Sequence, residues 1–315
     1  MIHRLDMPMP GMLGTVNCYL VVNGSRAALI DTGMASERNI AAMKRALARF
    51  GHTVSSLEKV ICTHYHPDHA GFGKFFQDAG TEVFMSRQDS NELTRWQADS
   101  NFDDDLVAFG GEHDVPADFL ASVSPVFAYL RTLQQRFAPS ALDDNDNGID
   151  IAGVPFEIIY TPGHTDGHIG LFQRETCVVI SGDHILAQSA VNIVLKHQSQ
   201  YDAPLAQYLL SLEKISSLGA ALALTGHGEP IQDVRSRCVE LSALHQRRLV
   251  KVKEALRQSP LTAYELSTLA FGEKRRSFSK WLGMAQTISY LEYLMQKGEV
   301  TCGWFGNRKT FSRVG

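Results

Sequence analysis

The chain has 315 residues, of which 44% are hydrophobic and 20% charged, and this composition is typical of a globular protein with one large or two medium domains. The apolar runs are too short to cross a bilayer, and the first residues, MIHRLDMPMPGMLG, lack the apolar stretch of a signal peptide, so we expect neither a membrane protein nor a secreted one. Five scattered cysteines without a C-x-x-C pair exclude a disulfide framework and a cysteine metal site, and they favour a cytoplasmic location.

Charge is distributed unevenly along the chain. Residues 240–315 carry 13 Lys and Arg against 6 Asp and Glu, a net charge of +7, whereas residues 1–239 carry 17 and 28, a net charge of −11. A basic end on an acidic body predicts two domains with different roles, one over residues 1–239 and one over 240–315.

The first third of the chain alternates short strands with turns and helices, which predicts a layered α/β fold. TVNCYLVV (15–22) is β-branched and apolar, and Asn23-Gly24 after it supplies a hairpin turn. A helix is expected over 36–51, with Ser36 as its N-cap. The other elements expected in this part are strands at 27–31, 57–64 and 81–86 and a short helix at 71–80.

The pattern changes between residues 87 and 140, where the sequence is helical and polar with scattered aromatic residues. We interpret 87–140 as a helical insertion, either a subdomain that packs on itself or a lid over the site, since long insertions are often functional. After it we expect strands at 149–161, 168–186 and 221–230, helices at 205–218, 240–258, from Thr262 and at 279–297, and two strands about Gly306-Asn307. The final order of three helices and a hairpin is the outline of a winged helix.

Residue types that bind metals recur in four places, each at the end of an apolar strand. These are THYHPDH (63–69), TPGHTDGH (161–168), SGDH (181–184) and TGHGEP (225–230). Strand ends at one edge of a sheet can converge on one cleft, and imidazoles and carboxylates at this density cannot be buried without partners. The sequence therefore predicts a site for one or two divalent metal ions.

One further acidic stretch resembles a calcium loop. DDNDNG (143–148) fills the first positions of an EF-hand, but the twelfth position is Val154, where calcium needs a bidentate Glu. We interpret this stretch as an Asn-Gly hairpin turn instead.

The four motifs T-H-x-H-x-D-H, G-H-T, G-D and G-H-G, preceded by IDTG at 30–33, resemble in this order the signature of the metallo-β-lactamase superfamily. The resemblance covers residues 1 to about 235. Within the superfamily the chain resembles the glyoxalase II-like hydrolases. SGDHIL…LAQYLLSLEKI…TGHGEP, followed by a basic winged helix, is similar to the beta-lactamase-like protein 2 branch. The resemblance implies a four-layer αββα sandwich with two metals at its open edge.

The resemblance also implies a role for each site residue. The first metal would be held by His64, His66 and His164, the second by Asp68, His69 and His227, with Asp183 bridging the two metals. Asp31 would orient the loops around the metals without binding one. Nitrogen and oxygen ligands suit Zn²⁺, our first expectation, and equally Mn²⁺ or Fe²⁺.

The chemistry expected of such a centre is hydrolysis. A bound zinc ion lowers the pKa of water from about 15.7 to about 7, so a water between two cations becomes a hydroxide near neutral pH. This metal-bridging hydroxide would attack an ester, thioester or phosphodiester, and Asp68 beside it could move its proton. No G-x-S-x-G motif offers a serine nucleophile.

Three functions remain open from the sequence. The first is hydrolysis of a thioester or ester of a small metabolite, for instance an acyl-coenzyme A whose phosphates would meet the basic residues Lys274, Arg275, Arg276 and Lys280. The second is a single-strand endoribonuclease, which the net +7 tail favours and which matches an animal relative of the similar branch. The third is a nucleic-acid-binding protein with a vestigial metal site, against which the complete ligand set argues. A homodimer is a further expectation.

Overall fold

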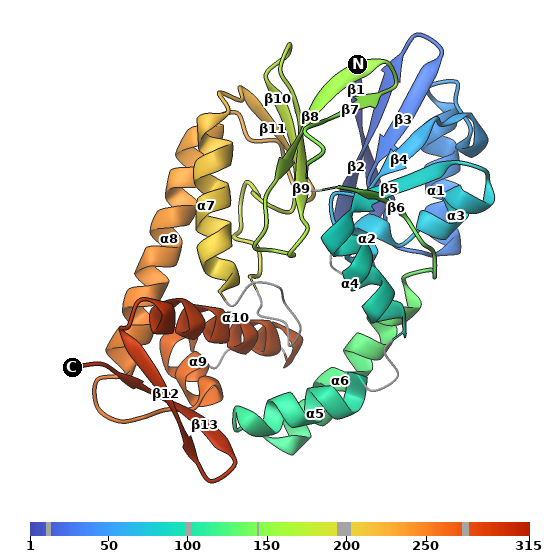
Figure 1. Ribbon diagram of the computed structural model, residues 1–315. Helices are drawn as coiled ribbons and strands as arrows, with labels where there is room; N and C mark the ends of the chain where they lie inside the picture. Colours follow the sequence, from blue (N-terminus) through green and yellow to red (C-terminus); the bar gives the residue numbers. More distant parts are fainter. Residues whose placement is uncertain (11–13, 99–101, 144, 194–202, 273–276) are drawn as a thin grey trace. The chain divides into compact units, whose positions relative to one another are not determined.

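The structure is a computed structural model that describes residues 1–10, 14–98, 102–143, 145–193, 203–272 and 277–315 (Figure 1). The chain forms two compact units. Unit 1 comprises Met1–Ala98, Leu130–Val191 and Ser211–Cys238, and unit 2 comprises Asp99–Tyr129, Asn192–Leu210 and Val239–Gly315. None of the helices in the described ranges is long and apolar enough to cross a membrane.

Unit 1 is built on two sheets (Figure 1). In the first, the strand order is β1-β2-β3-β4-β5-β6, with β1 (Ile2–Pro8), β2 (Thr15–Asn23), β3 (Arg26–Ile30), β4 (Lys59–Ile61), β5 (Glu82–Ser86) and β6 (Ser140–Leu142). In the second, the order is β11-β10-β9-β8-β7, with β7 (Gly148–Ile151), β8 (Val154–Tyr160), β9 (Ile169–Gln173), β10 (Val178–Gly182) and β11 (Leu222–Thr225).

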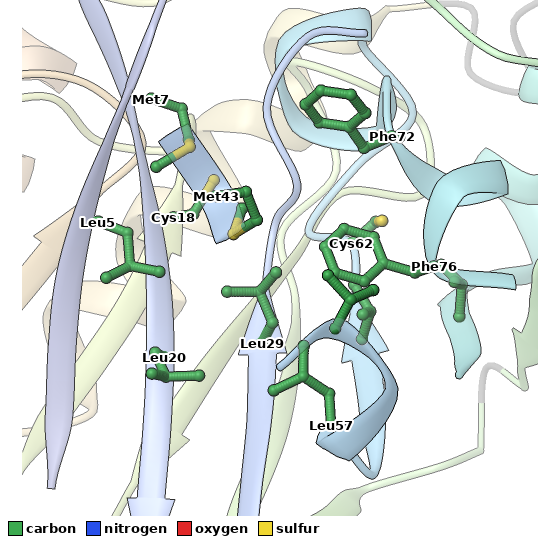
Figure 2. Packing of buried hydrophobic residues seen from close by; sticks show 14 of the residues in the cluster. Leu5, Met7, Cys18, Leu20, Leu29, Met43, Leu57, Cys62, Phe72 and Phe76 are labelled. Atoms are coloured by element: carbon green, nitrogen blue, oxygen red, sulfur yellow. The ribbon is translucent and has the colours of Figure 1, made fainter. Parts of the chain in front are cut away.

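Strand β2 shows why the first sheet is covered on both faces. Successive side chains of a strand point to opposite faces, and here both sets are apolar. Cys18 and Leu20 belong to one hydrophobic cluster with residues of the helices α1 (Glu37–Ala48) and α3 (Gly73–Asp78), shown in Figure 2. Tyr19 and Val21 belong to a second cluster, which includes Phe156, Leu171 and Ile180 of the other sheet. The two sheets therefore pack face to face, with helices on the outer face of the first.

The outer face of the second sheet is covered by a helix as well. In the half of α7 (Pro204–Ser217) that belongs to unit 1, Leu212 and Ile215 are buried. Ser211 Oγ donates a hydrogen bond to the carbonyl of Pro162, and Lys214 Nζ donates one to the carbonyl of Tyr160. These contacts complete the predicted αββα order of layers.

Helix α1 begins as the sequence predicts. Ser36 is in an extended conformation, and its side chain accepts a hydrogen bond from the backbone N–H of Asn39. This bond satisfies one of the amides that the first turn of a helix leaves open. The hairpin turn at Asn23-Gly24 is also confirmed, since β2 and β3 pair as antiparallel neighbours and Gly24 has a φ of 61°.

Strand direction brings the motif loops to one edge. Strands β3, β4 and β5 are parallel to one another, and β10 is parallel to β11. Because β8 is antiparallel to β9 and β9 is antiparallel to β10, strands β8, β10 and β11 share one direction. The loops that follow β4, β8, β10 and β11 carry the four motifs, so each sheet presents them at the edge formed by its strand ends.

The interpretation of DDNDNG as a hairpin turn is wrong. Strand β6, before this stretch, pairs with β5 in the first sheet, whereas β7, after it, pairs with β8 in the second. The segment therefore connects the two sheets. Its Asn and Gly residues, which are typical of tight turns, lie in this connection and not in a hairpin. Strand β1 is an element that the sequence analysis did not anticipate.

Unit 2 contains α5 (Phe102–Glu112), α9 (Ala263–Phe271), α10 (Ser277–Gln296), β12 (Val300–Phe305), β13 (Arg308–Arg313) and parts of α6 (Ala117–Thr132), α7 and α8 (Val234–Ala255). The order α8, α9, α10, β12, β13 is three helices and a hairpin. Thr262 and Glu265 form a capping box at the start of α9.

Aromatic residues of α5 and α6 pack against the C-terminal helices of unit 2. The ring centroids of Phe109 and Trp281 are 5.8 Å apart, and those of Phe119 and Tyr264 are 5.9 Å apart. Of the insertion expected at 87–140, residues 99–129 thus belong to unit 2, while α4 (Arg87–Ala98) belongs to unit 1.

Candidate metal centre

The loops of unit 1 bring the seven predicted ligands together at one place. Potential ligand atoms lie within 4.8 Å of one another in each of three groups. The groups are His64, His66 and His164; His64, His69 and Asp183; and Asp68, His69 and His227. The first and third groups are the two sets of protein ligands that the resemblance implies.

Asp183 lies between the two sets. Its Oδ2 is 3.8 Å from Nε2 of His164 and 3.5 Å from Nε2 of His227, while its Oδ1 is 3.4 Å from Nε2 of His69. One carboxylate thus reaches a member of each set, which is the placement that a bridging ligand needs. Asp68 Oδ2 is 3.2 Å from Nε2 of His227 on the far side of the site.

A proline turns the chain between the ligands of the first loop. His66 is extended, with φ −58° and ψ 149°, and Pro67 is the first residue of the short helix α2 (Pro67–Ala70). Proline suits this position because its fixed φ is helical and its missing N–H would have no partner there. The turn sends His64 and His66 to one set and Asp68 and His69 to the other.

Asp31 holds His69 from behind. Its Oδ2 is 2.8 Å from Nδ1 of His69, and its Oδ1 accepts a hydrogen bond from the backbone N–H of Thr63 at 2.7 Å. Asp31 has a φ of 60°, a left-handed conformation that costs free energy in a non-glycine residue. The carboxylate lies outside all three groups of potential ligand atoms, in agreement with its expected orienting role.

His168 supports the loop of Asp183. Its ring is fully buried, its Nε2 accepts a hydrogen bond from the backbone N–H of Asp183 at 3.1 Å, and its Nδ1 is 2.7 Å from Oγ1 of Thr161. Both ring nitrogens are therefore engaged. His168 braces the strand ends that carry the site.

Strand β2 fixes the loop of His227, a function that sequence reasoning missed. Asn17 Nδ2 donates hydrogen bonds to the carbonyls of Thr225 and Gly228, both at 2.9 Å. The hydroxyl of Tyr19 also donates to the carbonyl of Thr225, at 2.6 Å. A buried asparagine in the otherwise apolar run TVNCYLVV is the signal that could have revealed it, because buried amides need hydrogen-bond partners.

The electrostatics of the site favour a cation. Burial opposes the charge on His69, but Asp183 and Asp31 raise its pKa well above the usual value. Burial likewise opposes the charge on Asp68, yet His69 and His227 lower its pKa to about 2. Burial and the neighbouring His69 and His66 lower the pKa of His64 well below its usual value. Asp68 is thus ionised and His64 neutral, as metal ligands are, whereas His69 takes up a proton between the carboxylates and so carries the positive charge that a metal ion would bring.

Two buried atoms give a direct test of this fit. Nε2 of His69 and Oδ1 of Asp183 have no well-formed hydrogen bond to any atom of the described residues, although both are buried. A buried polar atom without a partner is costly. A divalent cation at the centre of the site would satisfy both atoms, so the residues present fit the metal.

The fold and this cluster agree with comparisons to known proteins. The chain belongs to the metallo-beta-lactamase superfamily, whose family model matches residues 11–227. It is similar to the crystal structure of the metallo-beta-lactamase family protein TTHA1429 from Thermus thermophilus, with a TM-score of 0.87 and 31% identity over 99% of this chain and 98% of that one. The predicted superfamily and its α/β fold are therefore confirmed.

Three curated relatives extend the comparison. The probable metallo-hydrolase YqjP of Bacillus subtilis is 28% identical over 98% of this chain and 97% of its own length. The Beta-lactamase-like protein 2 homolog of Caenorhabditis elegans is 24% identical over 92% of this chain and 80% of its own length. The hydroxyacylglutathione hydrolase GloC of Haemophilus influenzae is 26% identical over 67% of this chain and 85% of its own length. With its His/Asp metal-binding cluster, the chain is a metal-dependent hydrolase.

Proposed function

We propose that this hydrolase holds two divalent metal ions, with zinc as the first candidate, and that it cleaves a thioester or ester of a small metabolite. His64, His66 and His164 would hold one ion, Asp68, His69 and His227 the other, and Asp183 both. The observation that carries this proposal is the position of Asp183, whose Oδ2 lies within 3.8 Å of Nε2 atoms from both sets. When bound, two such ions supply a hydroxide near neutral pH and stabilise negative charge on the reacting carbonyl.

The side chains divide the remaining work. Asp31 holds the ring of His69 through Nδ1, which keeps Nε2 directed into the site. Asp68 is the proposed catalytic residue, because its carboxylate lies at the site and remains 16% exposed, so that it can exchange a proton with water or substrate. A pKa of about 2 keeps this carboxylate ionised, which is the state in which it can bind a metal ion.

The choice of thioester rests on the relative GloC, whose name assigns it the hydrolysis of hydroxyacylglutathione. The basic residues expected to meet coenzyme A give less support. Lys274, Arg275 and Arg276 lie outside the described residues, and Lys280 Nζ donates a hydrogen bond to the hydroxyl of Tyr264 at 2.7 Å. We therefore propose cleavage of a thioester bond, and the substrate panel described below identifies the thiol that is released. We also propose a cytoplasmic location, because all five cysteines are free.

The test is hydrolysis by the metal-replete protein of a panel of acyl-coenzyme A and acyl-glutathione compounds, followed by release of free thiol. We expect turnover that falls at least ~100-fold in Asp68→Ala, because both a ligand and a proton acceptor are removed. Asp78→Ala is the matched control, since Asp78 is exposed and pairs only with Lys74 among the ion pairs of the described residues.

A flat panel at full metal occupancy would refute the thioester proposal. A labelled single-stranded RNA, cleaved by the wild-type protein and spared by Asp68→Ala, would then establish the endoribonuclease instead.

A further inference from the structure

Asp89 is a buried carboxylate that the proposed chemistry does not use. It is the third residue of α4, and its side chain has no exposed surface. Its Oδ2 accepts hydrogen bonds from the backbone N–H of Tyr65 at 3.1 Å and from Oγ1 of Thr165 at 2.6 Å. Its Oδ1 accepts one from the backbone N–H of Gly167 at 2.7 Å. Asp89 thus joins two loops that are about a hundred residues apart in sequence.

These two loops carry all three ligands of one predicted set, and beyond the turn at Pro67 the first loop continues to Asp68 and His69 of the other set. Tyr65 lies between His64 and His66, and Thr165 follows His164. The other set is anchored elsewhere. His69 is held by Asp31, and Nδ1 of His227 lies 3.1 Å from the carbonyl oxygen of Thr15. The two sets are therefore held by different contacts, with Asp89 beside ligands of the first set, and with Asp31 on His69 and also on Thr63, the residue before His64.

The neighbouring residues make the Asp89 anchor rigid. The hydroxyl of Ser86 donates a hydrogen bond to the carbonyl of Gly167 and accepts one from the backbone N–H of Asp89 at 3.3 Å. A Cβ at Gly167 would lie only 2.9 Å from Oδ1 of Asp89 and would overlap Ser86 Oγ, so only glycine allows this approach. The carbonyl of Tyr65 accepts a hydrogen bond from Gln134 Nε2 at 2.7 Å, which holds the same residue from its other side.

The chemistry of these contacts requires a carboxylate. An ionised carboxylate only accepts hydrogen bonds, and an amide of the same size must present an NH₂ group on one side. Three groups of the described residues donate to the Asp89 carboxylate, and two of them are backbone N–H groups that cannot reverse their role. An asparagine would therefore keep the volume and lose at least one bond to the loops.

We propose that Asp89 is a positioning residue that sets the affinity of the metal site formed by His64, His66 and His164, independently of the second site. This inference rests on the proposed two-metal function. Partners that orient metal ligands typically account for 10- to 100-fold in metal affinity. We expect Asp89→Asn to weaken one of two zinc-binding steps by about 10-fold or more and to leave the other step within about 2-fold of the wild-type value.

The experiment titrates the metal-free protein with zinc against a chelating competitor, so that two dissociation constants are obtained without any assay of activity. His66→Ala removes a ligand of the first set and identifies its binding step. The step that weakens in Asp89→Asn should be the same one, and Asp31→Asn should weaken the other step more than this one, because Asp31 holds His69 directly. Thr165→Val should weaken the first step by a smaller factor, and Thr165→Ser, which retains the hydroxyl, should restore it.

The remaining outcomes would refute either the positioning role of Asp89 or the two-metal function on which it rests. Two unchanged constants in Asp89→Asn would refute the positioning role while leaving the two-metal proposal intact. A parallel loss at both sites, together with a lower melting temperature of the metal-free protein, would show that Asp89 has a general structural role. If Asp89→Asn does not fold, the Thr165→Val and Thr165→Ser pair decides in its place. A wild-type protein that binds no zinc would refute the proposed function itself.

Discussion

Gly226 shows how closely the backbone approaches the site. A Cβ at this position would overlap Oδ1 of Asp183 and would lie 2.7 Å from Cε1 of His69. Asp31 holds His69 and His168 holds the Asp183 loop, so neither neighbour can move away from a Cβ without breaking a hydrogen bond. Glycine is therefore required here for space, because its φ lies outside the left-handed region.

We predict that Gly226→Ala lowers hydrolytic activity and metal affinity at least ~10-fold, since it displaces two proposed ligands at once. The metal content after dialysis and the turnover on the best substrate measure the effect. Gly111→Ala is the control, because a Cβ there meets no atom within 4 Å. Equal metal content in both variants would contradict the steric argument.

At the scale of single residues, local motifs predicted which residues gather at the candidate site, because each stands in a short stretch of unusual composition. Asp89 and Asn17 could not be found in this way. Asp89 contacts Thr165 across 76 residues, and Asn17 contacts Thr225 across 208. Such contacts exist only after the sheets have assembled, so a single sequence can show that Asn17 is unusual in an apolar run but not which groups it or Asp89 contacts.

At the scale of elements, helix α1 illustrates a local signal that held. Asn39, Met43 and Leu47 form its buried face, at a spacing of four residues, and Ser36 caps its first turn. The positions of most strands were also predictable, because an apolar run bounded by turn residues is visible within a short stretch of sequence. Sheet membership was not. Strands β6 and β7 are neighbours in sequence, yet they belong to different sheets, because their partners β5 and β8 were fixed by packing.

The cap of α1 gives a prediction that separates stability from catalysis. Ser36→Ala removes the acceptor for the Asn39 N–H, and we expect the free energy of unfolding to fall by about 1 kcal/mol. Ser36→Asp keeps an acceptor and should retain most of the stability. Urea unfolding of both variants measures the difference. Because α1 covers the face of the sheet that is turned away from the second sheet, metal affinity should not change; a change in affinity would show that the cap also affects the site.

At the scale of the whole molecule, the two units carry different chemistry. The metal cluster belongs entirely to unit 1. Unit 2 contains a buried histidine of another kind: His245 of α8 has no exposed surface, and its Nδ1 is 3.0 Å from the hydroxyl of Tyr290 in α10. Arg248 donates to the same hydroxyl at 3.4 Å. Burial, assisted by the charge of Arg248, lowers the pKa of His245 to about 3.

This shift makes unit 2 sensitive to acid. Below its ordinary pKa of 6.5, His245 binds a proton in the unfolded chain, but in the folded chain it does so only near pH 3. Its contribution to stability is therefore complete above pH 6.5 and is lost as the pH falls from 6.5 towards 3. Between pH 7 and pH 5 this amounts to about 2 kcal/mol.

Urea unfolding followed by tryptophan fluorescence, at pH 7 and at pH 5, tests the prediction. The stability difference between the two pH values should be about 2 kcal/mol smaller in His245→Leu than in the wild-type protein. An equal difference in both proteins would mean that other groups cause the acid sensitivity; His113, whose pKa burial lowers to about 4, would be the next variant to make.

The proposed ligands in unit 1 come from both sheets: His64, His66, Asp68 and His69 follow β4, whereas His164, Asp183 and His227 follow β8, β10 and β11. Neither sheet alone can form the site, so we expect it to close late in folding, after the two sheets have packed together. Contacts that form after the transition state slow unfolding and leave the folding rate nearly unchanged. Bound metal would thus act on the lifetime of the native state. A cell that withdrew the metal would shorten that lifetime and expose the chain to proteolysis, with no change in how fast new copies fold.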